Sequence, residues 1–382
     1  MTRVAHLASR PRVLVLSAPI GVGHDGAARE LVRRLGRRGV SAQVLDWTSL
    51  VPAWGRQLLR ELYAPSVRYT PGLFDKIFAD LEHPNRAASR LAERLCRAAE
   101  PGALAAARDM DAVVATYPLA GRTLGALRAD GRLGVPALSF LTDPAAHRTW
   151  CHPGLDEHLT VTAATAVHGR RYGVAMRAVG PLCAPRFSRP KPQATRERLR
   201  GELGVPSQVP LALLASGSLG MGEVEHAVRA LQQHPRAWSV VACGRNTKLR
   251  GRLAGLERVV ALGWRDDVPD LMAAADVLVH NAGGLSCTEA LVAGLPVVTY
   301  RPIPGHGRAN AAVLAGAGLA AWPSSPLELA AAVEQCHRER ASLPRRRPRA
   351  ATWWTDDADA SAVVAKYAGV DGFGDAAGVA AG

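Results

Sequence analysis

The stretch "HNAGGLSCTEALVAGLPVVTYRPIPGHGRAN", His280 to Asn310, decides how the second half of the chain folds. The apolar run "ADVLVH", which ends at His280, predicts a strand, and the glycines after it turn the chain. "LSCTEALVAG" then predicts a helix that ends at Gly294, and "LPVVTY" predicts a buried strand. A strand, a helix and a second strand in this order predict a parallel pair with a helical crossover.

The start of the predicted helix is suited to bind an anion. Its free N–H groups and the positive end of its dipole favour a phosphate near Gly284 to Cys287. Glu289, one turn further along, could accept two hydrogen bonds from the cis-diol of a sugar. Together these features indicate a nucleotide, with its diphosphate at the turn and its ribose on Glu289. A glutamate that only serves the helix dipole would show the same local pattern.

Segments typical of strands and of helices alternate along both halves of the chain. The first half contains "RVLVLSAP", "DAVVATYP" and "VPALSFLTD", and the second contains "VPLALLASGS", "WSVVACG" and "RVVALGW". This alternation predicts an α/β architecture of two Rossmann-like, doubly wound domains that face a common cleft. The predicted parts are an N-terminal domain at 1–183, a proline-rich linker at 184–200, a C-terminal domain at 201–350, a return helix at 351–370 and a frayed tail at 371–382.

The charge balance favours anionic partners. The formal net charge is +14, and most of the positive charge comes from arginine, since lysine stands only at positions 76, 191, 248 and 366. Such a surplus attracts nucleic acid, anionic lipid or a phosphorylated substrate, although genomic base composition alone can also enrich arginine. No zinc-finger spacing or aromatic RNA-binding signature accompanies the charge, so we do not expect a nucleic-acid partner.

The cysteines and the hydropathy pattern indicate a cytoplasmic location. The six cysteines are scattered without a Cys-x-x-Cys pair, which is typical of reduced thiols rather than of disulfides or a metal site. The first apolar run, "VLVLSAPIG", is too short for a secretion signal, and no stretch approaches 18 uncharged apolar residues. A protein of this kind that works on a membrane would lie on its surface.

A glycine-rich loop in the first half, "SAPIGVGHDGAARELVRRL", joins the first predicted strand to a helix. Gly21 and Gly23 allow a ligand to approach the backbone closely, and His24 stands at the helix start, where the dipole favours its neutral form. Because "GVGHDG" fits Gly-x-Gly-x-x-Gly and Asp46 follows the next strand, a dinucleotide enzyme is an alternative. A histidine that only caps the loop is another.

These motifs together resemble one family of glycosyltransferases. "SAPIGVGHDGAA", "LASGSLGMGEVE", "CGRN", "LGWRDDVPDLMAAADVLV" and the stretch quoted first are similar to enzymes with two Rossmann-like domains, the GT-B fold. Among them the chain most resembles the monogalactosyldiacylglycerol synthase and processive diacylglycerol glucosyltransferase family, and more distantly the peptidoglycan enzyme MurG. The resemblance extends from about Arg12 to the tail helix, and it assigns the acceptor to the first domain and a UDP-sugar to the second.

The resemblance implies a set of donor-binding residues in the second domain. Glu289 would hold the ribose, the helix start the diphosphate, and the "CGRN" and "LGWRDD" segments the uracil. The family's Gly-Gln-Glu-x-x-Asn pattern is only partly present, because His306 and Gly307 replace the Gln-Glu pair, which leaves the sugar open. The implied donor residues are Ser216, Gly217, Ser218, Gly220, Arg245, Trp264, Arg265, Gly283, Gly284, Leu285, Ser286, Glu289, Gly305, His306 and Asn310.

The resemblance also implies catalytic and acceptor-side residues in the first domain. His24 corresponds to the family's glycine-loop histidine, and "FLTDPAAHRTWCHPGLD" resembles its Thr-Asp segment. The catalytic base is therefore His24 or Asp143. The acceptor-side candidates are Gly21, Gly23, His147, Trp150 and His152. Histidines that simply hydrogen-bond their own loop are the alternative for His147 and His152.

The implied reaction is inverting sugar transfer without a cofactor. A helix dipole and backbone N–H groups can stabilise the leaving UDP without a metal. The two Asp-x-Asp matches, Asp109/Asp111 and Asp357/Asp359, lie in polar helix-like surroundings without neighbouring ligands, so we expect solvated charges and no essential metal.

A membrane-facing element is expected in "PAWGRQLLRELYAPSVRYTPGLFDKIF", where Trp54, Leu58 and Leu62 recur at helical spacing. A helix packed on the core would show the same pattern. With the arginine surplus, this segment predicts a peripheral protein on the inner face of an anionic membrane, acting on a lipid acceptor. The alternatives are a soluble acceptor, a UDP-sugar 2-epimerase and a non-catalytic sugar-nucleotide-binding regulator.

Overall fold

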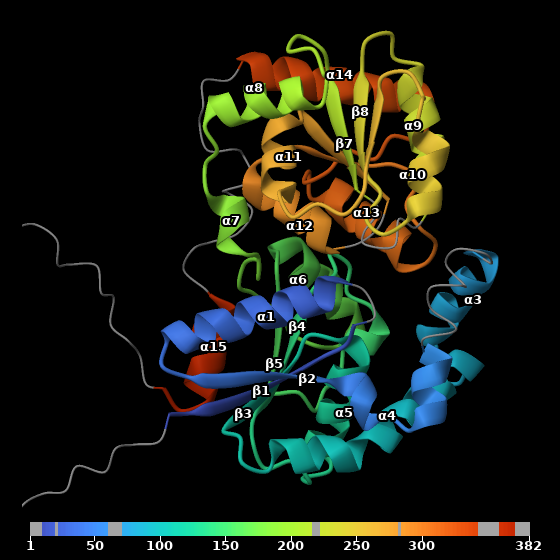
Figure 1. The fold of residues 1–382 in the computed structure, drawn as a ribbon. Coiled ribbons are helices and arrows are strands. Elements are labelled where there is room, and N and C mark those ends of the chain that lie inside the picture. The colour runs from blue at the N-terminus through green and yellow to red at the C-terminus, as the bar shows by residue number, and fades with distance from the viewer. Residues whose placement is uncertain are drawn as a thin grey trace, which may run out of the picture.

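The computed structural model describes residues 10–19, 22–59, 71–215, 222–281, 284–342 and 359–370. They form two α/β units, each built on one parallel sheet with helices on both faces, stacked end to end (Figure 1). The predicted fold class is confirmed.

The sheet of the first unit has the strand order β2-β1-β3-β4-β5-β6. Its central strands are buried along their whole length because helices cover both faces, as is typical of parallel sheets. The strands are β1 Arg12–Ser17, β2 Ser41–Asp46, β3 Ala112–Ala115, β4 Ala137–Leu141, β5 Glu157–Thr160 and β6 Arg177–Ala178.

Two apolar cores lie on the two faces of this sheet. Helices α4 and α5 pack on one face, and α1 and α15 pack on the other. The helices of the first unit are α1 Val22–Arg37, η1 Trp47–Leu50, α3 Pro71–Leu81, α4 Ala87–Ala107, α5 Pro118–Ala129, η2 Arg148–Trp150, α6 Ala163–Gly169, η3 Arg170–Tyr172 and, from the far end of the chain, α15 Ala360–Tyr367.

The sheet of the second unit has the order β11-β10-β7-β8-β9. Its strands are β7 Leu211–Ala215, β8 Trp238–Ala242, β9 Val259–Leu262, β10 Val277–His280 and β11 Val297–Thr299. Its helices are α7 Pro185–Ser188, α8 Gln193–Glu202, α9 Val224–Gln232, α10 Thr247–Leu253, α11 Val268–Ala274, α12 Gly284–Ala293, α13 His306–Gly316 and α14 Pro326–Ser342.

The strand-helix-strand unit predicted from His280 to Asn310 is confirmed. β10 and β11 pair in parallel, with Leu278 opposite Val297, and α12 connects them. Gly294 follows α12 with a φ of +74°, a left-handed conformation that glycine adopts without strain. The helices that follow β10 and β11 in the chain, α12 and α13, contact α1 and α6 of the first unit. The carboxyl ends of these two strands therefore face the first unit.

The chain returns to the first unit at its far end. Asp359 caps α15 by accepting a hydrogen bond from the Ser361 N–H, and it pairs with Arg34 of α1 at 3.0 Å. Arg34 also donates to the Pro181 carbonyl at 3.0 Å, so α1, the segment just before the linker and α15 are held together. The predicted linker, 184–200, contains α7 and most of α8.

Candidate active site

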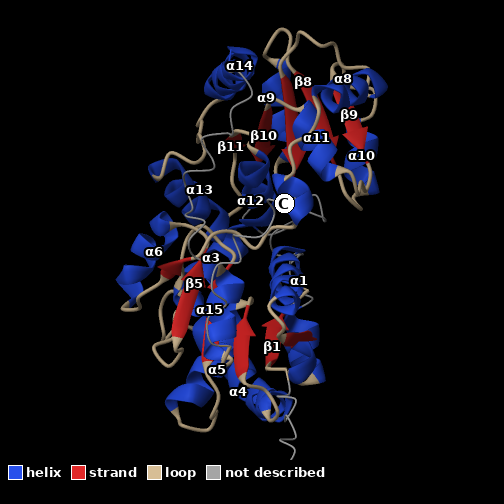
Figure 2. Cartoon of the chain, turned by 90° about the vertical axis from the view of Figure 1, so that its left-hand side faces the viewer, coloured by secondary structure: helices blue, strands red, loops and turns tan. Residues whose placement is uncertain are grey.

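The two units meet where α12 lies against α1 and α13 against α6, as the side view shows (Figure 2). Gly284, at the start of α12, approaches the first unit so closely that an added Cβ would lie 2.2 Å from the Thr142 carbonyl oxygen. Leu285 packs against Gly26 of α1, where an added Cβ would lie 3.0 Å from its Cδ2. Any larger residue at position 284 would push the units apart.

Asp143 stands at the centre of this junction, just beyond the end of β4. Its Oδ2 accepts from Trp150 Nε1 at 3.1 Å, and its Oδ1 accepts from Asn310 Nδ2 of α13 at 3.4 Å. Burial works to raise the pKa of Asp143, but His306, His24 and His147 outweigh it and hold that pKa below the usual range. The carboxylate is therefore ionised at neutral pH.

His24 lies beside this carboxylate at the start of α1. Its Nδ1 is 3.0 Å from the Thr142 hydroxyl, and its ring lies between those of Tyr117 and Trp150, with centroid distances of 5.4 and 5.8 Å. Burial lowers the pKa of His24, while Asp143 works to raise it. The imidazole is neutral at neutral pH and lies next to an anion that would stabilise its protonated form.

Two more histidines complete the group around Asp143. His147 Nε2 is 3.9 Å from Asp143 Oδ2, and its Nδ1 is hydrogen-bonded to the Thr149 hydroxyl. Burial lowers the pKa of His147 to about 4, and burial also lowers the pKa of His306 at the start of α13. The structure thus brings together His24, Asp143, His147, Trp150, His306 and Asn310 from the predicted set.

His152 holds its own loop instead of joining this group. Its Nδ1 accepts from the Gly154 N–H at 3.1 Å, and its ring packs against α5 at Gly125, where an added Cβ would lie 2.5 Å from that nitrogen. These contacts fit the alternative in which His152 hydrogen-bonds its own loop.

The donor-side residues follow α12 and the edge of the second sheet. Glu289 is half-buried on α12, and burial raises its pKa to about 7, while Arg186 of α7 works to lower it. Trp264 is 51% exposed, and the Arg245 guanidinium lies 5.2 Å from its ring centroid. Arg265 pairs with Asp267. Of the remaining predicted residues, Gly23 lies against Leu285 at the junction and Ser286 is half-buried on α12. Gly21, Ser216, Gly217, Ser218, Gly220 and Gly283 lie outside the described residues.

The acidic residue that a dinucleotide enzyme would need is engaged elsewhere. Asp46 caps η1, where it accepts from the Thr48 N–H at 2.8 Å and from the Thr48 hydroxyl at 2.7 Å. Asp111 and Asp359 of the Asp-x-Asp matches also serve the backbone, accepting from the Arg12 and Ser361 N–H groups. Within the described ranges, no cluster of three or more potential ligands has the geometry of a metal site. The absence of an essential metal stays a prediction.

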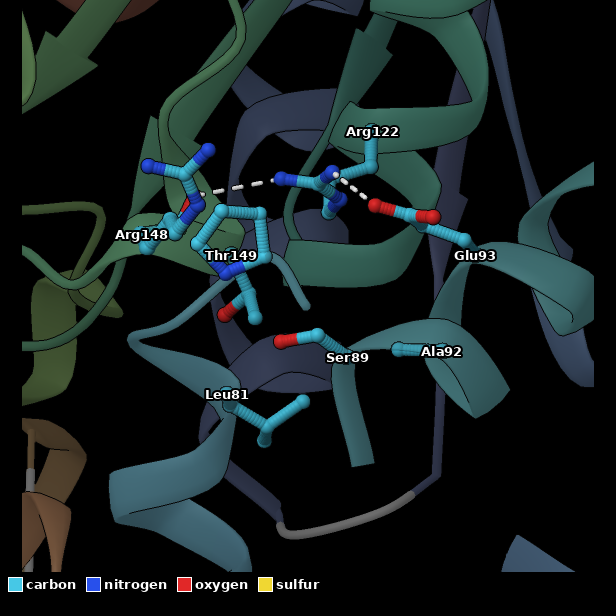
Figure 3. Close-up of a pocket in the computed structure, with 8 residues that line it drawn as sticks. Leu81, Ser89, Ala92, Glu93, Arg122, Arg148 and Thr149 are labelled. Atoms are coloured by element: carbon cyan, nitrogen blue, oxygen red, sulfur yellow. Dashed lines mark hydrogen bonds and ion pairs between the residues drawn. The ribbon is translucent and has the colours of Figure 1, made fainter. Parts of the chain in front are cut away.

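A small pocket lies between α3, α4, α5 and η2 and is lined by Leu81, Pro84, Ser89, Ala92, Glu93, Arg122, Arg148 and Thr149 (Figure 3). Arg122 crosses it, donating to the Arg148 carbonyl at 3.5 Å and lying 3.7 Å from Glu93. Thr149, which holds His147, forms part of the wall. The pocket therefore borders the loop that carries the acceptor-side residues.

Sequence reasoning missed the contribution of α3. Asp75 on this helix accepts a hydrogen bond from the Gly305 N–H, and Phe78 stacks edge-on against His147 at 5.2 Å. Asp75 and Gly305 are separated by 230 positions, so no local pattern could pair them. Thr142, which positions His24, could have been found from its place at the end of a strand.

Comparisons with known proteins match parts of both units to glycosyltransferase families. The family described as "Monogalactosyldiacylglycerol (MGDG) synthase" matches residues 24–183, and "Glycosyl transferases group 1" matches residues 214–339. The chain is a glycosyltransferase. The resemblance to the monogalactosyldiacylglycerol synthase and processive diacylglycerol glucosyltransferase family is confirmed.

Curated relatives of this glycosyltransferase include two processive diacylglycerol beta-glucosyltransferases. The one from Bacillus cereus (strain AH187) is 23% identical over 319 residues, 79% of each chain. The one from Bacillus pumilus is 26% identical over 186 residues, which cover 46% of this chain and 48% of that relative.

Solved structures share the fold. Acinetobacter baumannii MurG is 18% identical with a TM-score of 0.55, over 93% of this chain and 99% of that one. Anabaena HepE, in complex with UDP-glucose, is 17% identical with a TM-score of 0.54, over 86% and 90%. At these identities the likeness establishes the GT-B fold of the glycosyltransferase.

Proposed function

We propose that this glycosyltransferase moves a hexose, with inversion, from a UDP-sugar to a hydroxyl of a lipid such as diacylglycerol at a membrane surface. The observation that carries the proposal is the junction itself, where neutral His24 and ionised Asp143 lie against α12 and α13. The names of the Bacillus relatives support the lipid acceptor, and the UDP-glucose complex of HepE supports the donor.

His24 is the better of the two candidate bases. A base works best when its pKa lies near the working pH, and the pKa of Asp143 is held below an already acidic value. His24 would take the proton of the acceptor hydroxyl while the oxygen attacks the anomeric carbon. Asp143 would stabilise the imidazolium that forms, since its charge already raises the pKa of His24 against the effect of burial.

The leaving UDP would be stabilised by the second unit. The bond from the anomeric carbon to UDP breaks as the new bond forms, and the negative charge develops on the diphosphate near the start of α12. Its free N–H groups and dipole oppose that charge, and Glu289, one turn along, would hold the ribose.

Surface chemistry on the first unit supports action at a membrane. Trp54 and Leu73 are 52% and 48% exposed, on the helical turn at 53–59 and on α3. The neighbouring α4 exposes Arg90, Arg94 and Arg97, spaced as on one helix face. Apolar anchors beside cations fit an anionic interface. No helix within the described residues is long and apolar enough to cross a bilayer, and Leu62, Tyr63 and Arg345 to Arg347 lie outside them.

The test is UDP release from a panel of UDP-sugars without added metal, with and without diacylglycerol in anionic liposomes. We expect release with one sugar only when the lipid is present, and a glycolipid of inverted anomeric configuration as the product. Vesicles without anionic lipid are the matched control for the membrane interaction.

Other outcomes would replace the proposal. Release that ignores lipid but responds to a soluble alcohol would favour a soluble acceptor. A changed sugar nucleotide without any acceptor would identify an epimerase, and UDP binding without turnover would favour a regulator.

A further inference from the structure

Helix α3 of the first unit holds the loop that begins α13 in the second unit. Asp75 Oδ1 accepts from the Gly305 N–H at 2.6 Å, and Asp75 Oδ2 accepts from Arg308. Gly305 is the N-cap residue of α13 and has no side chain to cap that helix. A carboxylate from the other unit therefore caps it, in the place where the helix dipole favours an anion.

Aromatic packing surrounds the same contact. Phe74 and Phe78 of α3 each lie 5.8 Å from His306, measured between ring centroids. Gly305 has a φ of +65°, and an added Cβ would lie 2.9 Å from Phe78. The positive φ favours glycine at position 305, and a larger side chain there would clash with Phe78 of α3.

The same loop leads into the proposed catalytic group. Asn310, one turn into α13, accepts from the Ala145 N–H at 2.9 Å and donates to Asp143. A shift of the start of α13 would therefore move His306 and Asn310 relative to Asp143 and His24. Helix α3 sits at one end of this chain of contacts, and the exposed Leu73 lies on it.

We propose that Asp75 is a positioning residue that couples the acceptor-side helix α3 to the sugar-facing loop 305–310. This inference rests on the proposed function and on the donor-binding role that the family resemblance implies for Gly305, His306 and Asn310. Asp75 acts through Gly305 and Arg308: it caps α13, helps to place His306 against Phe74 and Phe78, and links the two units. A lipid that engages α3 then also sets the geometry around the donor sugar.

The test compares Asp75→Ala, which loses both contacts, with Asp75→Asn, which keeps an oxygen for the Gly305 N–H but loses the charge facing Arg308. Asp80→Asn, on the same helix, is the matched control. Three readouts are needed: kcat and KM for lipid-dependent transfer, affinity for UDP against UDP-glucose, and hydrogen exchange of the 304–310 backbone.

We expect Asp75→Ala to lower kcat/KM about tenfold and to weaken UDP-glucose binding, while UDP binding and Asp80→Asn stay near wild type. Exchange of the Gly305 amide should become about tenfold faster, with Asp75→Asn in between. Unchanged exchange in Asp75→Ala would overturn the cap. Faster exchange with equal losses for UDP and UDP-glucose would overturn the sugar-specific role. If the wild type shows no lipid-dependent transfer but exchange is still faster in Asp75→Ala, the proposed function is rejected and the capping role of Asp75 stands.

Discussion

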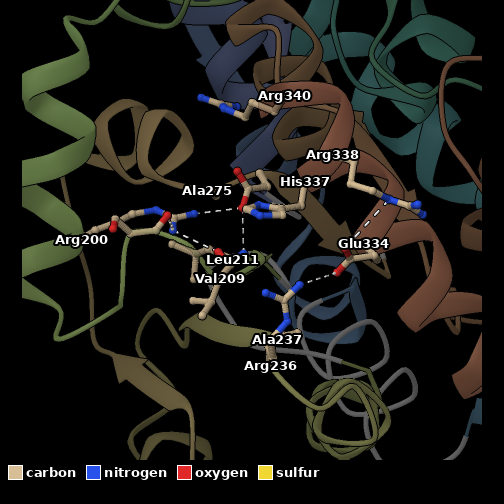
Figure 4. A network of polar contacts seen from close by, with 12 residues as sticks. Arg200, Val209, Leu211, Arg236, Ala237, Ala275, Glu334, His337, Arg338 and Arg340 are labelled. Carbon is tan, nitrogen blue, oxygen red and sulfur yellow. Dashed lines mark hydrogen bonds and ion pairs between the residues drawn. The ribbon is translucent and has the colours of Figure 1, made fainter. Parts of the chain in front are cut away.

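Two carboxylates of this glycosyltransferase, the fully buried Asp276 and the partly buried Asp143, have opposite surroundings. Asp276, at the entrance to β10, is fully buried and paired with Arg196 at 2.6 Å and Arg200 at 2.9 Å. It also accepts from the Leu211 N–H at 2.9 Å and lies 3.0 Å from His337 Nδ1, inside a dense polar network (Figure 4). Burial works to raise the pKa of Asp276, but the two guanidinium groups and the hydrogen bonds from Leu211 and His337 together hold that pKa below its usual range.

Asp143 has no guanidinium partner among its recorded contacts in the described residues. Three histidines, an indole N–H and an amide surround it, and burial keeps the histidines neutral. Arginine is always charged, so Asp276 is locked as part of a fixed scaffold. An imidazole, unlike a guanidinium, can gain and lose a proton, and the Asp143 charge favours the protonated form of His24, so Asp143 sits where a proton can move. The comparison separates a structural carboxylate from one suited to catalysis.

The largest expected effect comes from removing the proposed proton acceptor. His24→Ala should lower kcat by about 10²–10⁴-fold, the usual contribution of a general base, with UDP-glucose affinity retained. Steady-state kinetics and calorimetric titration measure the two quantities. Asp143→Asn should also lose turnover, because the imidazolium would lose its counter-charge. Retained turnover in His24→Ala would transfer the role of base to Asp143.

The second effect appears in stability instead of activity. Asp276→Asn leaves Arg196 and Arg200 buried without their anion, so the free energy of unfolding should fall by about 3–5 kcal/mol. Asp143→Asn should cost less than about 2 kcal/mol, since its partners are neutral groups. Urea unfolding of both variants tests the contrast. Equal losses would show that the two carboxylates share one structural role.

The sequence predicts the surroundings of Asp143 better than those of Asp276. The strand-helix-strand unit, Glu289 on α12 and the group at the end of β4 follow from local periodicity, glycine turns and end-of-strand position. The Asp276 network joins α8, β10 and α14, and the Asp75 cap joins α3 to α13, so both depend on residues far apart in sequence. Such pairings are set by tertiary packing, which a single sequence does not display.

The third effect concerns the pH range in which the surroundings of each carboxylate contribute to stability. The pKa of His147 is about 4 in the folded chain and about 6.5 in the unfolded chain. Between these pH values the unfolded chain binds a proton at this residue and the folded chain does not, so protonation favours unfolding. The stability from neutral His147 is therefore complete above pH 6.5 and is lost as pH falls toward 4. Asp276, whose pKa is lowered from 3.8, loses its contribution only at lower pH.

Urea unfolding at pH 7 and pH 5 measures this separation. We expect His147→Gln to reduce the loss between these pH values by about 1–2 kcal/mol. His158, whose pKa is also lowered to about 4 by burial, should act in the same window and serves as a positive control. An unaltered pH slope in His147→Gln would contradict the neutral, buried state of that imidazole.

The smallest effect concerns a third carboxylate, Glu289, which lies between the two extremes. Burial raises its pKa to about 7, against the lowering effect of the Arg186 guanidinium. If the ionised form holds the ribose hydroxyls, about a tenth of the free enzyme is competent at pH 6 and about nine tenths at pH 8. UDP-glucose affinity should then rise up to about tenfold over this range.

The diphosphate of UDP-glucose is esterified at both ends and does not titrate between pH 6 and pH 8, so a change in affinity reports a titrating group of the protein. Glu289→Gln should remove the pH dependence, and a control substitution of the exposed Glu328 on α14, Glu328→Gln, should retain it. A pH-independent affinity in the wild type would mean that Glu289 serves the helix and the fold, as Asp276 does, and that ribose is held by other groups.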